Sequence, residues 1–425
     1  MDALVGLWVF ALGLAGYLIF ARRSGDVLHP LAVFWGSWLL VFAFAHFNVP
    51  RSFDEPYYAE PFGLVAYGAT FAGLISFVSG FLLVRPGLAL PTAEDRIAWE
   101  TRLRGGLDVG RLGVWTVLLF LVASVTTAFF IRRAGAIPLL SPRINELRLD
   151  FKLPYWGYLY DLHFAVALFA SMLAVWTRGA RRWAWVGLAI ASTLLLMSGG
   201  VRVSPLTALA WVIVFLTYRP GRLRLRRVVL ALLIVGLVFG VIEQYRRSTF
   251  RADPRLANPR LDMGVPATLW AHSAASFKNL QFTLERVSPL YMGLTSYDLP
   301  KTLYPTAREV DQEFSYLYGT HNTPTFLSFL YFDFGWGGLL LIPALYGAVV
   351  AFVYDRFRRR PSIFWLVVYV DFLLATALAF RTHRFFGNSL IFFAGIALLT
   401  QVLVARRSDA SVALPLPTAL GAGAS

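Results

Sequence analysis

The stretch "TFLSFLYFDFGWGGLLLIPALYGAVVAFVYDRFRRR", residues 325–360, is apolar over most of its length and ends in a cluster of arginines. A run of about 20 apolar residues is long enough to cross the hydrocarbon core of a bilayer as a helix. The run from 325 to 354 is roughly ten residues longer than one span needs, and the helix-loosening sequence "GWGG" (335–338) lies inside it. This stretch therefore predicts a short re-entrant segment, followed by a membrane span that ends at the arginines.

The rest of the chain has the same character. Of its 425 residues, 57% are hydrophobic and 16% are aromatic, and the mean hydropathy is +0.61. These values exclude an ordinary soluble domain and favour a protein with repeated membrane spans. The chain contains no cysteine, which excludes disulfides, thiolate chemistry and cysteine-ligated metal sites.

The formal net charge of +15 is strongly basic. It could indicate a nucleic-acid partner, but basic loops that stay in the cytoplasm account for it in a multi-pass protein. We therefore predict no nucleic-acid partner. Only Lys152, Lys278 and Lys301 are lysines among the 39 basic residues, and the planar guanidinium of arginine suits bidentate binding of phosphate.

The apolar runs predict an all-α polytopic membrane protein of about eleven transmembrane helices with one large extracytoplasmic loop. The loops between them alternate between arginine-rich and mixed, and the positive-inside rule then places the N-terminus in the periplasm and the C-terminus in the cytoplasm. The predicted spans are 2–20, 30–48, 62–84, 112–131, 160–177, 183–198, 203–218, 227–243, 325–354, 362–380 and 386–404.

This topology divides the chain into four parts. A bundle of eight spans covers residues 1–243, and a large periplasmic loop with short surface helices, one of them over 266–288, covers 244–323. Residues 324–407 hold the re-entrant segment and the last three spans. The tail at 408–425 is rich in Pro, Ala and Gly, which is typical of disorder.

Several outer turns carry more cations than the positive-inside rule favours. The short loop 132–159 has five of them, so either the topology differs there or the cations serve an anionic ligand; we favour the ligand. Each cation also has a simpler explanation, namely contact with lipid phosphates. The candidate anion-binding residues are Arg143, Arg202 in "MSGGVRVSPL" (197–206), Arg246 and Arg247 in "EQYRRSTFR" (243–251), and Arg381, His383 and Arg384 in "FRTHRFFGNS" (380–389).

The end of the large outer loop, "REVDQEFSYLYGTHNTP" (308–324), gathers groups that could transfer protons. Histidine suits this work because its ordinary pKa is about 6.5. Asp333 lies just beyond, inside an apolar run, where an acid is costly and usually faces a cavity or a cation. The candidates are Arg308, Asp311, Glu313, Tyr318, His321, Asn322 and Asp333.

No soluble-enzyme motif is present: there is no phosphate-binding glycine loop, no HExxH and no paired aspartates of the kind that hold Mg²⁺. We therefore predict no metal and no cofactor.

The segment "HNTPTFLSFLYFDFGWGGLLLIPALYG" (321–347) resembles the segment that follows the large outer loop in Wzy-type O-antigen polymerases, which are oligosaccharide repeat-unit polymerases. "MSGGVRVSPL" resembles the same family's motif at a span boundary. The number of spans and the late outer loop are also similar. Arg308 and Gly319 match the family's spacing of an Arg, ten residues and a Gly, but no second such pair lies in an earlier outer loop.

The resemblance implies an inverting, metal-independent membrane glycosyltransferase with a GT-C-like fold in the bacterial inner membrane. Donor and acceptor would be glycans linked to undecaprenyl pyrophosphate, joined at the periplasmic face, and a chain-length regulator is a possible partner. The arginines would stabilise the pyrophosphate, together with His383. The base would be His321, Glu313, Asp311 or His383.

Two alternatives stay open. An O-antigen ligase, which moves the glycan to lipid A core, would share the fold and the donor. A transporter or flippase for lipid-linked oligosaccharides predicts paired broken helices in symmetric halves. The sequence shows no internal repeat and one candidate broken segment, which favours the polymerase.

Overall fold

The computed structural model describes most of the chain, and its regular elements there are helices. The described residues are 2–46, 61–85, 93–141, 143–144, 147, 151, 156–201, 203–219, 265–288, 292–293, 296, 324–385 and 387–406. The helices are α1 (Asp2–Ser24), α2 (Pro30–Ala45), α4 (Leu64–Val84), α5 (Ala93–Gly105), α6 (Val109–Ala134), the 3-10 helix η1 (Pro138–Leu140), α8 (Gly157–Trp176), α9 (Ala180–Ser198), α10 (Val203–Tyr218), α12 (Val265–Arg286), α15 (Phe326–Arg359), α16 (Ile363–Leu378) and α17 (Asn388–Val404).

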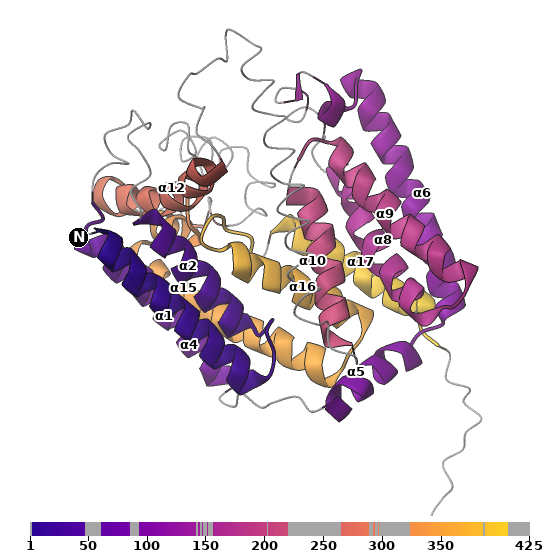
Figure 1. Ribbon diagram of the computed structural model, residues 1–425, viewed down its shortest axis with the longest axis horizontal. Helices are drawn as coiled ribbons and strands as arrows, with labels where there is room; N and C mark the ends of the chain where they lie inside the picture. The colour runs from indigo at the N-terminus through magenta and orange to yellow at the C-terminus, as the bar shows by residue number, and fades with distance from the viewer. Residues whose placement is uncertain are drawn as a thin grey trace, which may run out of the picture.

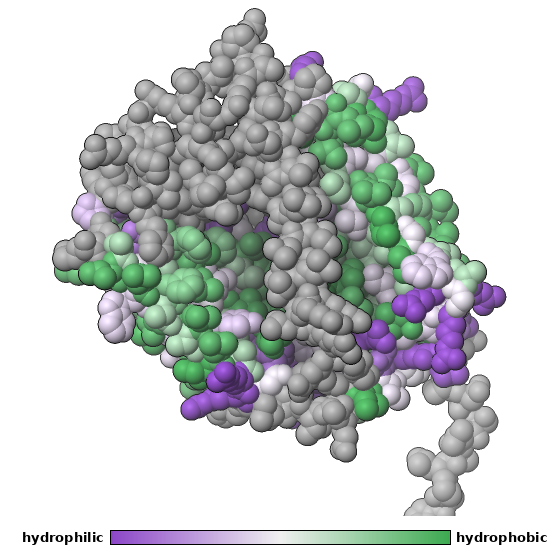
Figure 2. Space-filling model, in the orientation of Figure 1, coloured by the Kyte–Doolittle hydropathy of each residue, from purple (hydrophilic) through white to green (hydrophobic). Residues whose placement is uncertain are grey.

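Many of these helices are suited to a bilayer. Within the described residues, α1, α4, α6, α8 and α15 are long and apolar enough to cross it, and α2, α10, α16 and α17 are shorter apolar helices. On the face that Figure 2 shows, much of the described surface at the left and at the right is hydrophobic. The protein is therefore an all-α, multi-pass membrane protein, as the sequence predicts. The predicted span 227–243 lies outside the described residues, and the number of eleven stays a prediction.

The helices form two groups (Figure 1). In the first group α1 packs on α2 and α4 packs on α15, while in the second α8 packs on α6, α9 and α10. Helix α16 contacts α2 and α15 on one side and α10 and α17 on the other. Helix α12 contacts α2, α4 and α15. The core therefore runs through α16 from one group to the other.

Helices α4 and α15 approach closely because each carries glycine at the crossing. A Cβ atom on Gly80 would collide with the backbone carbonyl of Ala344, and one on Gly347 would collide with that of Phe77. Small residues at a crossing let two membrane helices gain backbone-to-backbone packing.

We expect Gly80→Val to destabilise the protein by about 1–3 kcal/mol, because the two backbones must separate to admit the side chain. The matched control is Gly68→Val on the same helix, since a Cβ atom at Gly68 meets nothing within 4 Å. The thermal unfolding midpoint in detergent measures both. Equal midpoints for the two variants would contradict the close crossing.

Helix α15 is interrupted inside the sequence "GWGG". Gly335 has φ 62° and ψ −153°, a conformation that glycine adopts without steric cost. Just before the break, the buried Asp333 accepts a hydrogen bond at Oδ2 from the backbone N–H of Ser296 at 2.6 Å, and its carbonyl accepts one from Met292. The sequence predicts a cavity or a cation beside this acid. In the structure, Asp333 accepts hydrogen bonds from the backbone of Met292 and Ser296, which precede α15 in the chain. A re-entrant role for residues 326–334 stays a prediction.

A buried polar cluster joins three elements at the other end of the bundle. Asp26, in the turn between α1 and α2, accepts hydrogen bonds at Oδ2 from the hydroxyls of Tyr218 on α10 and Tyr354 on α15. Arg358 of α15 lies 3.7 Å from the same oxygen. Burial lowers the pKa of the neighbouring His29 to about 4, so its ring is neutral at pH 7 and Nδ1 accepts the N–H of Leu31. The cluster ties the first helix group to the second.

Candidate active site

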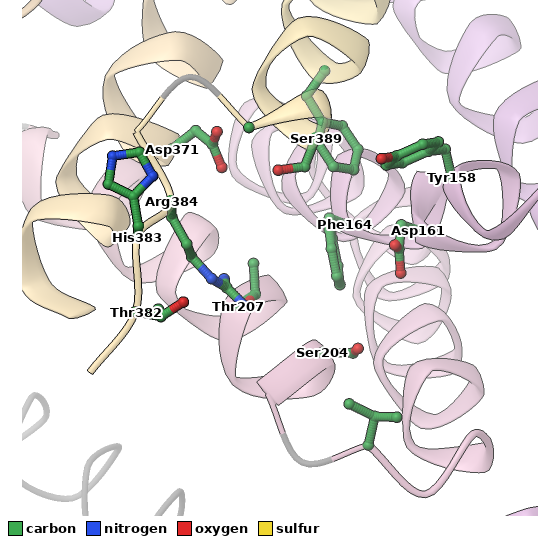
Figure 3. A pocket seen from close by; sticks show the side chains of 13 residues that line it. Tyr158, Asp161, Phe164, Ser204, Thr207, Asp371, Thr382, His383, Arg384 and Ser389 are labelled. Carbon is green, nitrogen blue, oxygen red and sulfur yellow. The ribbon is translucent and has the colours of Figure 1, made fainter. Parts of the chain in front are cut away.

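A polar pocket of about 370 Å³ opens between α8 and α10 on one side and α16 and α17 on the other, at the end where α8, α10 and α17 begin. Its walls come from α8, α10, α16, α17 and the turn between α16 and α17 (Figure 3). The lining residues are Tyr158, Asp161, Phe164, Val201, Ser204, Thr207, Asp371, Thr382, His383, Arg384, Gly387, Ser389 and Phe393. A polar cavity within a bundle of apolar helices is the default candidate for a functional site.

Among the residues that the structure describes, two carboxylates and one permanent cation face this pocket. Asp371 projects from the apolar helix α16, and Asp161 comes from the first turns of α8. Arg384 extends into the pocket from the α16–α17 turn (Figure 3). Charged groups at this depth are costly unless they face water, a partner or a ligand.

The α16–α17 turn is held firmly in place. The backbone N–H of Phe326, at the start of α15, donates to the carbonyl of Ala379 at 2.9 Å. The buried ring of Phe385 stacks on Tyr346 of α15, with 4.5 Å between ring centroids. His383 shares a 2.7 Å hydrogen bond between Nε2 and the Tyr346 hydroxyl. These contacts fix His383 and Arg384 against the pocket, as a binding site requires.

The opposite wall depends on the turn between α9 and α10. Gly200 has φ +69°, and a Cβ atom on Gly199 would lie 3.0 Å from the hydroxyl of Tyr160. That hydroxyl donates to the carbonyl of Leu196 at 2.7 Å. The two glycines of "MSGGVRVSPL" thus allow a tight turn that packs on α8 and brings the start of α10 to the pocket.

The structure brings together some of the residues that the sequence predicts. His383 and Arg384 line the pocket, and Arg381 is in the same turn. Arg202 lies outside the described residues, although its neighbours Val201 and Ser204 line the pocket. Arg143 and Asp333 do not line the pocket. Arg143 follows η1 and is exposed, and Asp333 is hydrogen-bonded to Ser296 just before the break in α15. The other candidates fall outside the described residues: Arg246, Arg247, Arg308, Asp311, Glu313, Tyr318, His321 and Asn322.

Outside the segment 380–389, five polar lining residues were not predicted as site residues: Tyr158, Asp161, Ser204, Thr207 and Asp371. For Asp371 the signal was visible, because it is an acid inside an apolar span. For the other four residues the sequence gives no comparable signal.

The pocket has the chemistry to hold an anion and hydroxyl groups together. A guanidinium binds phosphate oxygens by paired hydrogen bonds, and ionised carboxylates accept hydrogen bonds from hydroxyls. In the part of the chain that the structure describes, no three His, Asp or Glu side chains lie close enough together to hold a metal ion.

Comparison with protein families finds a match over most of the chain. The family model described as "Putative O-antigen polymerase" matches residues 29–380, which is most of the chain. The chain belongs to this O-antigen polymerase family. The family that the sequence predicts is thus confirmed, and the match includes both 197–206 and 321–347. No curated protein and no solved structure matches the chain.

Membership of the O-antigen polymerase family supports a polymerase role in O-antigen synthesis, with lipid-linked oligosaccharides as substrates. The matched region includes the whole of α8, α10 and α16, and it ends directly before Arg381. Three walls of the pocket therefore belong to the region that the family shares, and the α16–α17 turn follows it immediately.

Proposed function

We propose that the protein is an inverting, metal-independent glycosyltransferase that polymerises oligosaccharide repeat units linked to undecaprenyl pyrophosphate. The reaction takes place at the periplasmic face of the bacterial inner membrane, in a GT-C-like fold. The N-terminus is periplasmic and the C-terminus cytoplasmic. We propose a chain-length regulator as a protein partner.

The observation that carries this proposal is the pocket with Arg384, His383, Asp161 and Asp371. It lies at the end of the bundle that the positive-inside rule assigns to the periplasm. A lipid-linked donor places its pyrophosphate near the headgroups, with its hydrocarbon tail in the bilayer. A polar pocket at a helix end, surrounded by apolar helices, suits such a substrate.

The reaction exchanges one bond to the anomeric carbon for another. The oxygen of an acceptor hydroxyl forms a bond to the anomeric carbon of the donor's first sugar, while the bond from that carbon to the pyrophosphate oxygen breaks. A base takes the hydroxyl proton, and undecaprenyl pyrophosphate leaves with the electron pair. Fixed cations lower the barrier by stabilising the charge that develops on the leaving group.

Arg384 is the described residue best placed to stabilise the leaving pyrophosphate, with Arg381 and His383 in the same turn. We assign the same role to the outer cations Arg143, Arg202, Arg246 and Arg247. The proton acceptor comes from His321, Glu313, Asp311 or His383, with Arg308, Tyr318, Asn322 and Asp333 supporting the site. Asp161 and Asp371 add two acceptors for sugar hydroxyls within the pocket.

The direct test is incubation of the purified protein with lipid-linked repeat units, followed by gel separation of the products. A ladder of products spaced by one repeat unit is the expected result. A single transfer that occurs only when lipid A core is added would identify a ligase. Movement of the substrate across a liposome membrane without a new glycosidic bond would identify a flippase.

A further inference from the structure

A second hollow lies far from the polar pocket, at the end of the bundle where α8 ends and α9 begins. It has a volume of about 570 Å³ and is lined by Val109, Gly110, Gly113, Val114, Val117 and Leu118 of α6, Leu173 and Thr177 at the end of α8, and Arg181 and Trp185 of α9. We call it the α6–α9 groove. Its walls are mostly apolar, and one cation lies at its mouth.

The groove exists because α6 has no side chain at two positions on one face. Gly110 and Gly113 are three residues apart, so they lie on the same side of the helix. A Cβ atom on Gly113 would lie 3.2 Å from the ring of Trp185, so the indole packs against the backbone of α6. Beyond it, Val114 is 65% exposed and Leu118 is 47% exposed. The groove is thus open along the hydrophobic outer face of α6.

The groove has the length of one leaflet. From Val109 to Leu118, a helix rises roughly 14 Å, and half of a bilayer's hydrocarbon core is about 15 Å thick. Trp183 and Trp185, in the first turns of α9, are of the residue type that gathers at headgroup level. An acyl chain that lies along α6 would therefore fill the groove from the headgroups to the middle of the membrane.

The cation at the mouth has no protein counter-ion in the described part of the chain. Arg181 forms no ion pair there, and neither do its neighbours Arg178 and Arg182, whereas Arg111 of α6 pairs with Asp108 at 3.5 Å. Hydrophilic residues gather at this end of α6 and α9, next to a hydrophobic face (Figure 2). Of the three arginines in the α8–α9 turn and the start of α9, only Arg181 lines the groove.

We infer that the α6–α9 groove binds an anionic phospholipid, with one acyl chain along α6 and the headgroup phosphate on Arg181. The lipid comes from the leaflet on the side of the α8–α9 turn, which the positive-inside rule assigns to the cytoplasm. Basic pockets between membrane helices on that side are suited to anionic lipid headgroups. This site does not depend on the glycosyl transfer proposed above.

The test is native mass spectrometry of the full chain in detergent, titrated with phosphatidylglycerol or with phosphatidylcholine of the same acyl chains. We expect the first phosphatidylglycerol to bind about fivefold more tightly than phosphatidylcholine, since one arginine near the headgroup contributes this much. Arg181→Glu is expected to remove the preference. Equal affinities of the parent protein for the two lipids would overturn the site.

Two further variants locate the site. Arg178→Glu changes the charge by the same amount in the same turn but lies outside the groove, so it should keep most of the preference. If Arg178→Glu lowers the preference for phosphatidylglycerol as much as Arg181→Glu does, that preference comes from the basic surface as a whole and the groove is not the site. Val114→Trp, at an exposed position, should weaken the first binding of both lipids, and unchanged binding would exclude the acyl chain from the groove.

Discussion

Replacing Arg384 with alanine is expected to lower the rate of repeat-unit transfer by ~10²–10³-fold, because removing one fixed donor to a developing negative charge costs about this much. Arg384 is the permanent cation that extends into the pocket. The turn that carries it is anchored by other residues, namely Phe385 on Tyr346 and Phe326 on Ala379. The variant should therefore fold normally and lose turnover, which single-turnover kinetics with a lipid-linked donor can measure.

Two controls separate this effect from a general loss of positive charge. Arg384→Lys keeps the charge but not the planar fork, so it should recover only part of the rate. Arg286→Ala removes an exposed arginine from the last turn of α12, outside the pocket, and should change the rate little. If Arg384→Ala and Arg286→Ala behave alike, Arg384 has no role in stabilising the leaving group.

Most of the described helices could be predicted from the sequence because an apolar run fixes both the type and the approximate length of a membrane helix. The run 203–218 coincides with α10, and the run 30–48 begins where α2 begins. Helix α5 was missed, since "AEDRIAWETRLRG" is highly charged and lies within an arginine-rich loop. Its Trp99 is buried and donates to the carbonyl of Phe357 at 3.0 Å, a contact between residues far apart in the sequence.

The part of the candidate site that lies in a short, highly charged turn could be predicted from the sequence. The part that depends on how the helices pack against one another could not. The α16–α17 turn was recognised because three potential cations within five residues are costly at a membrane boundary. The inward direction of Asp161 and Asp371 depends on how α8 and α16 rotate against their neighbours. Helix rotation follows from interhelical contacts, which one sequence without its structure does not specify.

The buried cluster around Asp26 illustrates the same limit and leads to the largest expected effect on stability. The segment "RRSGDVLHP" (22–30) reads as an ordinary basic turn. In the structure its aspartate is 3% exposed and accepts hydrogen bonds from Tyr218, Tyr354 and the backbone N–H of Leu28. Its carboxylate is also the counter-ion of Arg358, whose side chain is 15% exposed. One carboxylate therefore connects the α1–α2 turn, α10 and α15, which are far apart in the chain.

We expect Asp26→Ala to destabilise the protein by about 3–5 kcal/mol, because it leaves a buried arginine without its counter-ion. Asp26→Asn keeps an oxygen acceptor for the tyrosines and should cost less. The double variant Asp26→Ala with Arg358→Met should recover part of the loss, since it removes the unpaired charge as well. Thermal and denaturant unfolding in detergent measures each variant.

The matched control lies one residue further along α15. Arg359 pairs with Asp355 at 2.9 Å, but its side chain is 76% exposed, and an exposed pair contributes only about 0–1 kcal/mol. Arg359→Ala should therefore change the unfolding midpoint little, although it removes the same charge as Arg358→Ala. A small loss in Asp26→Ala, comparable with that in Arg359→Ala, would mean that the cluster is hydrated and does not hold the two helix groups together. A large loss that Arg358→Met partly reverses would assign the stability to the buried pair itself.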